Sequence, residues 1–259
     1  MQSTEAGAGV VHGRSSTFTT LYSLVFWSYL LATCVVLFAV SLLVFLITAP
    51  FDRRRRILHR YTCWWAAHYL AWAPFASVKV EGKEHVRGIG ACVYVSNHQS
   101  MVDILAVFAS YLDFLWISKR ENFYAPFLGW NMVLNGYIPL KRGYLPSIRR
   151  MVRACREKLA AGHSLFIFPE GTRSPDGTIQ SFFRGAFYLA NKNRVPVVPI
   201  VLEGTNRVLP KRSARVNPGP VLVRVLAPVY PSEVGYDEQE LMRVVRERML
   251  AEQRRLRSQ

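Results

Sequence analysis

The sequence of 259 residues has few cysteines and no spacing that suits a disulfide framework or a metal site. Its four cysteines, Cys34, Cys63, Cys92 and Cys155, lie far apart and form no CxxC pair. This usage predicts free thiols in a reducing compartment, and no bound metal. No internal repeat or low-complexity linker divides the chain, whose length suits one sizeable α/β domain plus a membrane segment.

Acidic residues are also scarce, because 17 Asp and Glu face 33 Lys and Arg and leave a formal net charge of +16. Such an excess favours anionic partners, among them nucleic acid, anionic lipid headgroups, phosphorylated metabolites and an acidic carrier protein. Charge alone does not choose among these partners.

Charge of either sign is missing between residues 15 and 51, where residues 24–47 are nearly continuous apolar sequence. As a helix, that segment is about 36 Å long and can span a bilayer. Four arginines follow at positions 53–56, and the positive-inside rule places them in the cytoplasm. A nucleic-acid patch is the weaker alternative for this run, since it adjoins the apolar segment. We expect a flexible tail (residues 1–20) and a single-pass transmembrane helix (21–50) in the cytoplasmic (inner) membrane. A re-entrant hairpin in place of a single crossing is the alternative.

The following segment, residues 61–76, is aromatic and apolar but too short to span comfortably. Four of its rings are of the kind that settles at the headgroup boundary: Trp64, Trp65, Tyr69 and Trp72. We expect residues 51–76 to form a basic juxtamembrane segment and an interfacial helix. An ordinary core helix is the alternative.

From residue 77 onward, short hydrophobic runs alternate with helical segments. Seven runs predict buried strands, at residues 77–80, 91–96, 114–118, 137–140, 164–168, 197–202 and 221–226. The alternation predicts an α/β domain over residues 77–259, with a mostly parallel sheet flanked by helices.

Polar residues directly follow the strand expected at 91–96, and ligands bind at the carboxyl ends of strands in open α/β sheets. His98 falls in the loop and Asp103 in the first turn of the next helix, so the carboxylate can reach one imidazole nitrogen. The other nitrogen then remains to accept a proton from a hydroxyl. The alternative is structural, with Ser100 and Asp103 forming a capping box and His98 an ordinary loop residue.

A second polar turn follows the strand expected at 164–168 and presents Glu170 and Arg173, with Gly171 between them. Glycine lets the backbone approach a ligand closely, and arginine can bind a phosphate through two hydrogen bonds. A solvated turn without function is the alternative.

These segments resemble the motifs of the glycerolipid acyltransferases. Residues 98–103 resemble the HxxxxD motif, and residues 168–173 (FPEGTR) resemble the motif expected downstream of it. Three further segments resemble the remaining motifs in order: Lys119, Glu121, Pro126 and Gly129; residues 136–142 (GYIPLKR), which end in Arg142; and residues 195–200. The ordered set covers roughly residues 77–205 and is most similar to the 1-acyl-sn-glycerol-3-phosphate acyltransferases of bacterial type. One departure is that Pro139 and Lys141 stand where aromatic or aliphatic and acidic residues are common.

The resemblance implies transfer of a fatty acyl chain from acyl-CoA or acyl-carrier protein to the sn-2 hydroxyl of 1-acyl-sn-glycerol 3-phosphate (lysophosphatidate), giving phosphatidic acid. It implies that His98 removes the hydroxyl proton and that Asp103 fixes the imidazole tautomer. It further implies a substrate-binding set made of Lys119, Arg142, Glu170, Gly171, Thr172 and Arg173. Of these, the cations would hold the phosphate, and Glu170 would position the glycerol backbone. The implied partners are lysophosphatidate, the acyl thioester, the bilayer and an acyl-carrier protein as one possible donor. No nucleic acid is expected as a partner, and no cofactor beyond the acyl donor.

Other functions remain open from the sequence. The same chemistry could act on another lysophospholipid, a lyso-aminolipid or glycerol 3-phosphate. A membrane-tethered nucleic-acid-binding protein would explain the charge but not the polar residues that follow the strands. A non-catalytic lipid-binding relative would not require the intact set of His98, Asp103, Glu170 and Arg173.

Overall fold

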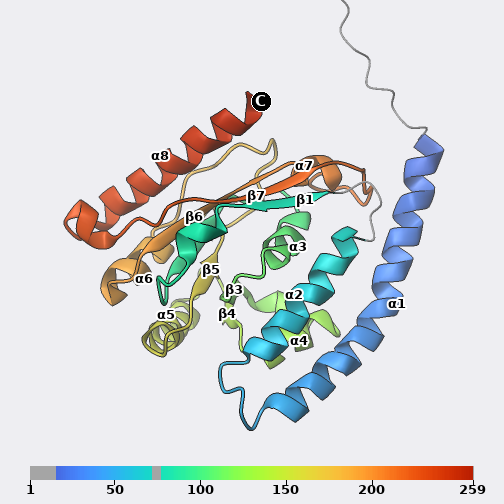
Figure 1. The fold of residues 1–259 in the computed structure, drawn as a ribbon, viewed down its shortest axis with the longest axis horizontal. Coiled ribbons are helices and arrows are strands. Elements are labelled where there is room, and N and C mark those ends of the chain that lie inside the picture. The colour runs from blue at the N-terminus through green and yellow to red at the C-terminus, as the bar shows by residue number, and fades with distance from the viewer. Residues whose placement is uncertain (1–15, 72–76, 259) are drawn as a thin grey trace, which may run out of the picture.

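The structure, a computed structural model, describes residues 16–71 and 77–258. Its centre is a sheet of seven strands in the order β1-β7-β6-β2-β5-β3-β4, flanked by helices (Figure 1). The strands are β1 (Val78–Glu81), β2 (Val93–Ser96), β3 (Leu115–Lys119), β4 (Ile138–Leu140), β5 (Leu165–Ile167), β6 (Val197–Glu203) and β7 (Val221–Val225). Every neighbouring pair is parallel except β6 and β7. The predicted α/β fold with a mostly parallel sheet is confirmed, and the strand ends differ from expectation by at most two residues.

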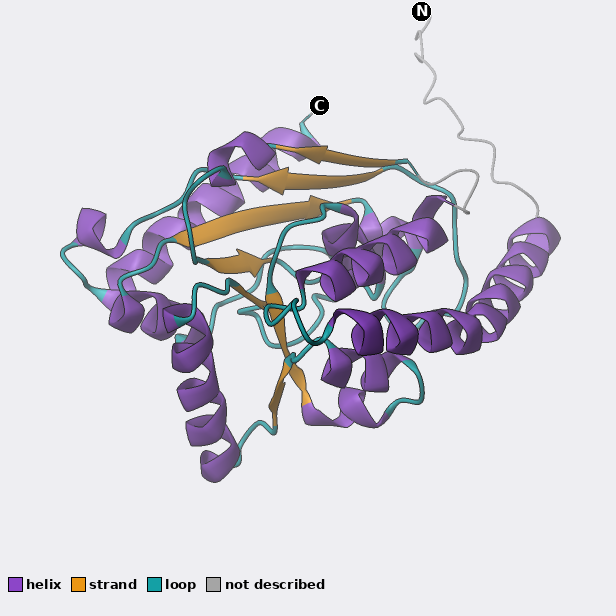
Figure 2. Cartoon of the chain, turned by 60° about the horizontal axis from the view of Figure 1, so that its bottom comes forward, coloured by secondary structure: helices purple, strands orange, loops and turns teal. Residues whose placement is uncertain are grey.

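Eight α-helices occur in the described residues: α1 (Ser16–Thr48), α2 (Arg56–Ala71), α3 (Val102–Ala109), α4 (Leu128–Leu134), α5 (Leu145–Ala160), α6 (Gly185–Asn193), α7 (Thr205–Val208) and α8 (Glu238–Arg257). Short 3₁₀ helices are η1 (Lys83–Val86), η2 (Arg120–Tyr124) and η3 (Pro231–Val234). The β1 and β4 ends of the sheet are turned steeply relative to each other (Figure 2), which reflects the usual strand twist. The central strands β2 and β6 are almost wholly buried, as the continuous apolar runs of a covered parallel sheet require.

The apolar helix expected from the sequence is confirmed, but it begins earlier than expected. Helix α1 starts at Ser16, so residues 16–20 are helical and not part of a flexible tail; residues 1–15 lie outside the described residues. Within the described chain it is the helix long and apolar enough to cross a membrane by length and composition. Many of its large apolar side chains are exposed, including Leu24, Leu31 and Leu43.

Helix α1 contacts the α/β domain near both of its ends. Near its start, the indole Nε1 of Trp27 donates to the carbonyl of Ala214 at 2.7 Å, and Ser23 Oγ accepts from Val216 N at 2.9 Å. Further along, Ser41 Oγ donates to Asn131 Oδ1 of α4 at 2.6 Å. The helix is therefore attached to the domain and does not project away from it.

Helix α2 differs in part from the interfacial helix that the sequence suggested. Trp64 is exposed, but Trp65 and Tyr69 are buried, and α2 packs on α1 and α3. The Tyr69 hydroxyl accepts from Trp65 Nε1 at 3.0 Å and hydrogen-bonds Thr33 Oγ1 of α1 at 2.9 Å. Because adjacent residues point about 100° apart around a helix, rings next to each other in sequence cannot all face one surface. This face of α2 therefore packs in the core, as the alternative expectation had it. Trp72 lies outside the described residues.

The arginine run fastens the two N-terminal helices to the domain. Arg54 Nη2 donates to the carbonyl of Ala161 at 2.8 Å, just beyond α5, and Arg55 Nη1 donates to that of Leu134 at 2.5 Å, at the end of α4. Arg56 pairs with Asp113 at 3.0 Å. Cations are favourable at helix C-termini, where carbonyl groups lack helical partners. Whatever its influence on topology, the run is also a structural clamp.

Candidate active site

Asp103 contacts both His98 and the backbone that leads into α3, although the complete capping box with the Ser100 side chain does not form. Asp103 Oδ2 accepts from His98 Nδ1 at 2.7 Å, which fixes the orientation of the imidazole. The same oxygen accepts from the backbone N–H groups of Gln99 at 2.6 Å and Ser100 at 2.8 Å, at the start of α3. Asp103 is fully buried, while 15% of the His98 side chain is exposed. One carboxylate therefore holds both the ring and the loop that carries it.

Buried polar side chains of the same loop attach it to β6 and to the residue that follows α7. The amide of Asn97 donates to the carbonyl of Leu202 at 2.9 Å and accepts from the Leu202 N–H at 2.8 Å. Gln99 Nε2 donates to the same carbonyl, and Ser100 Oγ donates to Leu209 O at 2.7 Å. Since each bond joins segments about 100 residues apart, the position of His98 depends on the complete sheet.

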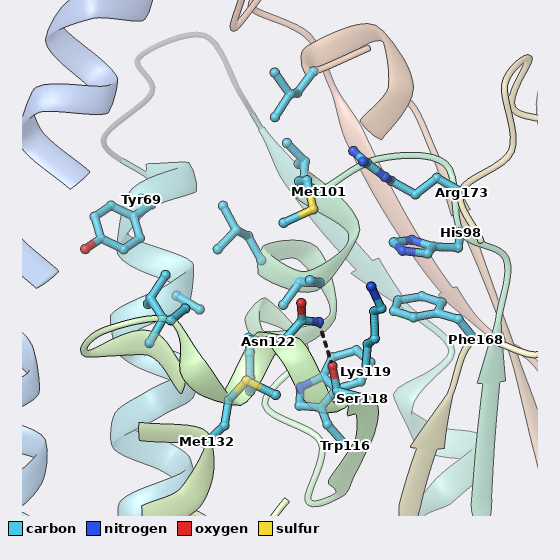
Figure 3. Close-up of a pocket in the computed structure, with 18 of the residues that line it drawn as sticks. Tyr69, His98, Met101, Trp116, Ser118, Lys119, Asn122, Met132, Phe168 and Arg173 are labelled. Carbon is cyan, nitrogen blue, oxygen red and sulfur yellow. Dashed lines mark hydrogen bonds between the residues drawn. The ribbon is translucent and has the colours of Figure 1, made fainter. Parts of the chain in front are cut away.

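The ring of His98 stacks on Phe168, with 4.0 Å between the ring centroids and an interplanar angle of 12°. In Figure 3, His98 lies between Phe168 and Arg173 at one side of a cavity, with Lys119 next to Phe168. Phe168 belongs to the second sequence motif, and its backbone carbonyl accepts from Gly171 N at 3.1 Å in the turn that follows. Stacking therefore links the two motifs directly.

Glu170 lies in a different place from the one expected. It is 4% exposed, is not among the residues that line the cavity, and its Oε1 accepts from the His98 N–H at 3.1 Å. Burial raises the pKa of Glu170 to about 7; hydrogen bonds from backbone groups of His98 and Gln180 oppose that rise. In this structure Glu170 holds the His98 backbone, and its contact with a glycerol group stays a prediction.

Gly171 needs its left-handed backbone conformation, with φ of 70°, and the space beside it is already filled. A Cβ at this position would lie 2.8 Å from Cε2 of Phe183 and 3.9 Å from Cζ of Arg142. The turn thus brings the last residue of the GYIPLKR segment against the FPEGTR segment. Gly171 and Thr172 line the cavity together with Arg142.

Three expected cations, Lys119, Arg142 and Arg173, are brought together because all of them line the same cavity as His98. Lys119 and Arg142 are exposed, and Arg173 is partly buried. Lys211, which the sequence did not single out, donates from Nζ to the carbonyl of Arg173 at 2.5 Å. Converging cations beside an imidazole suit a phosphate or another anionic group on a substrate.

Behind this polar mouth the cavity is apolar and measures about 570 Å³. Its wall comes from several elements, with Phe26 and Leu30 from α1, Trp65 and Tyr69 from α2, and Phe108 from α3. Figure 3 shows Tyr69 and Met132 on the side away from His98. The site can therefore hold a polar group beside the imidazole and a long apolar group behind it.

Several contributors could not be found from the sequence alone. Asn97 and Gln99 flank His98, but only the fold shows that both side chains reach β6. Phe168 stands in the motif, whereas Phe183 and Lys211 lie in loops without any periodic pattern. The sequence did contain one indication of Asn97 and Gln99, which is the run of polar residues at 97–100 directly after a strand.

Comparison with known proteins gives a family and several relatives for this chain. Residues 77–203 match the family described as Acyltransferase, so the chain carries an acyltransferase domain. It is 39% identical over 203 residues to a chloroplastic 1-acyl-sn-glycerol-3-phosphate acyltransferase of Brassica napus, covering 75% of this chain and 58% of the relative. With a chloroplastic enzyme of the same name from Arabidopsis thaliana the identity is 40% over 186 residues, covering 71% of this chain and 52% of the relative. The chain thus spans less than two thirds of the length of these relatives.

A solved structure is similar over almost its whole length. The crystal structure of the 1-acyl-sn-glycerophosphate (LPA) acyltransferase PlsC from Thermotoga maritima has a TM-score of 0.78 and 28% sequence identity. The match covers 93% of this chain and 98% of that chain. The similarity therefore includes most of the described helices as well as the sheet.

Proposed function

We propose that this protein transfers a fatty acyl chain from a thioester to the sn-2 hydroxyl of 1-acyl-sn-glycerol 3-phosphate, giving phosphatidic acid. The observation that carries the proposal is the His98–Asp103 pair at the polar end of a largely apolar cavity, with three cations at the same mouth. The names of the relatives support the acceptor. The cations match its phosphate, and the apolar depth matches a fatty chain.

In the proposed reaction, His98 Nε2 takes the proton from the acceptor hydroxyl as its oxygen attacks the thioester carbonyl. The tetrahedral intermediate collapses with loss of the thiolate, which receives that proton from the imidazolium. Asp103 holds Nδ1 and supports the positive ring. None of the four cysteines lines the cavity, and burial raises the pKa of Cys92 to about 11. Direct transfer without an acyl-enzyme therefore fits the site.

The test is an assay of the purified protein with lysophosphatidate and a panel of acyl-CoA and acyl-carrier donors, followed by mass spectrometry of the lipid product. Glycerol 3-phosphate and lysophospholipids with other headgroups serve as competing acceptors. We expect phosphatidic acid as the main product. Equal turnover of acceptors that lack the phosphate monoester contradicts the assigned acceptor.

We also propose that α1 holds the protein on the membrane without crossing it. Ser23 and Thr48, where α1 ends, are about 38 Å apart along the helix, which exceeds the roughly 30 Å hydrocarbon layer. The same domain nevertheless contacts Ser23 and, just beyond the end of the helix, Arg54. A crossing helix would place the contacts of Ser23 and Trp27 on the far side. We therefore favour α1 lying within the cytoplasmic leaflet over the single-pass orientation expected from the sequence.

A membrane-impermeant thiol reagent can separate the two arrangements. Single cysteines introduced at Thr17 and Arg53 should both react from the cytoplasmic side of sealed vesicles. The native cysteines are buried and should not react with the reagent. Labelling of the Thr17 position only from the opposite side supports a spanning helix and contradicts the leaflet arrangement. Carbonate should leave the protein on the membrane in either case, and its release by carbonate contradicts anchoring by α1.

A further inference from the structure

A second hollow of about 990 Å³ lies between α5 and α6, outside the proposed active site. Its floor is apolar, with Ile148, Val152 and Tyr188. Four arginines surround that floor: Arg149, Arg153, Arg156 and Arg184. Among the residues that the structure describes, the carboxylates of Glu157 and Glu238 line it as well. We call this surface the arginine groove.

Most of this charge is not neutralised by the protein. Arg153 has a partner, Glu157, at 4.0 Å, but both side chains are more than two-thirds exposed, so the pair is weak. No carboxylate in residues 16–71 or 77–258 forms an ion pair with Arg149, Arg156 or Arg184. An apolar floor with a cationic rim is complementary to an amphipathic helix that carries acidic residues.

Both walls of the groove begin at the mouth of the active-site cavity. Helix α5 starts at Leu145, three residues after Arg142, which lines the cavity. Helix α6 starts at Gly185, two residues after Phe183, whose ring fills the space beside Gly171. A partner seated between α5 and α6 therefore lies next to the entrance that leads to His98.

The groove faces away from the helix that we place in the membrane. Helix α1 packs on α2 and α4, whereas α5 packs on β4 and α6, on the other side of the molecule in Figure 1. Large exposed apolar side chains cluster on α1 and α4, including Leu128, Trp130 and Val133, but those of the groove floor are partly buried. A soluble acidic partner fits these surroundings better than a bilayer.

We infer that the arginine groove is the docking surface for an acidic acyl-carrier protein, which delivers its thioester-bearing arm to the neighbouring cavity. The inference rests on the proposed acyl transfer and identifies the donor for it. Acidic side chains of one carrier helix pair with Arg149, Arg156 and Arg184, and apolar side chains of that helix contact Val152 and Tyr188. Acyl-CoA, which lacks the protein moiety, enters the cavity without using the groove.

The decisive variant reverses two charges, Arg149→Glu with Arg156→Glu, on one face of α5. Arg150→Glu is the matched control, because Arg150 is the adjacent exposed residue on the same helix but does not line the groove. A hexadecanoyl acyl-carrier protein and hexadecanoyl-CoA are compared as donors to lysophosphatidate. Binding of the fluorescently labelled carrier protein is measured separately by anisotropy, and vesicle binding by co-sedimentation.

The double variant should lower kcat/KM for the carrier-linked donor and weaken carrier binding by about tenfold or more. Turnover of the CoA donor and vesicle binding should stay within about twofold, as should every property of Arg150→Glu. Weak carrier binding by the wild type, or equal losses with both donors, overturns the docking surface. A loss of vesicle binding by the double variant assigns the groove to anionic lipid, and this result also overturns the proposal that the groove binds a carrier protein.

The two proposals fail in different ways. If the carrier protein does not bind but the CoA donor still acylates lysophosphatidate, the groove is wrong and the acyl transfer stands. If neither donor is used, the acyl transfer is wrong. Even then, the groove is supported if the wild type binds the carrier protein and the double variant, Arg149→Glu with Arg156→Glu, does not.

Discussion

The two sides of the cavity mouth are built in different ways. On one side, His98 is fixed by Asp103, by the ring of Phe168 and by a backbone hydrogen bond to buried Glu170. On the other side, Lys119 and Arg142 are exposed, and the ion pair that Lys119 forms within the described residues is with Glu121 at 3.8 Å. A general base must be oriented before the substrate arrives, whereas long cationic side chains can close on a phosphate after it enters. Substitutions of the buried residues that hold His98 should therefore affect folding as well as turnover, and substitutions on the second side should affect mainly binding.

The largest expected effect on stability is that of Asp103→Ala. It leaves His98 Nδ1 and two buried backbone N–H groups without their common acceptor, and each orphaned donor costs about 1–3 kcal/mol. We expect the free energy of unfolding to fall by at least about 2 kcal/mol, measured by denaturant titration in detergent. Arg142→Ala serves as the control and should change it by less than about 0.5 kcal/mol. If Asp103→Ala and Arg142→Ala have similar free energies of unfolding, the two sides of the cavity mouth do not differ in the way described.

Glu170→Gln should change how stability depends on pH. The folded pKa of Glu170 is raised to about 7 from its ordinary 4.5, so the fold favours the protonated carboxyl. Its contribution is complete below about pH 4.5 and is lost as the pH rises through 7, which amounts to roughly 3 kcal/mol. Because a glutamine side chain cannot titrate, the variant should lose this decline, and its stability relative to wild type should rise between pH 5 and pH 8. Parallel pH profiles for the two proteins contradict the raised pKa.

Arg173→Ala tests the cationic side. The loss of a charge-assisted contact to the acceptor phosphate should raise KM for lysophosphatidate about tenfold to a hundredfold, equivalent to roughly 1.5–3 kcal/mol. KM for the thioester should change little, and so should the melting temperature. Equal effects on the two substrates contradict a direct contact between Arg173 and the phosphate.

Lys211→Met should produce the smallest effect, since Lys211 acts through the backbone of Arg173. A hydrogen bond from a charged group contributes about 1.5 kcal/mol or more, and only part of that contribution reaches the Arg173 side chain, so KM for lysophosphatidate should rise about threefold to fivefold. Lys192→Met makes the same change on α6, away from the cavity, and should have no effect. If both variants behave alike, Lys211 does not position Arg173.

Much of this architecture could be predicted from the sequence because its signals are local. Each strand is a short apolar run, and His98, Asp103 and Arg173 lie directly after strands whose carboxyl ends share one edge of the sheet. The place of Glu170 could not be predicted, because whether a carboxylate after a strand faces a cavity or a backbone N–H depends on the neighbouring loop. The docking of α1 through Trp27 and Ser23 depends on a loop 187 to 193 residues away. The roles of Trp65 and Tyr69 depended on the rotation of α2, which aromatic content does not specify.

The central claim is that His98 and Asp103 act as one catalytic unit in acyl transfer, and a double-mutant cycle tests it most directly. Turnover of lysophosphatidate and the melting temperature are measured on the same preparations of wild type, His98→Ala, Asp103→Asn and the double variant. His98→Ala should retain a near-normal melting temperature while kcat falls by roughly 10²–10⁴. Asp103→Asn should also depress kcat, and the double variant should be far less than multiplicatively worse. Full turnover by His98→Ala would contradict the account.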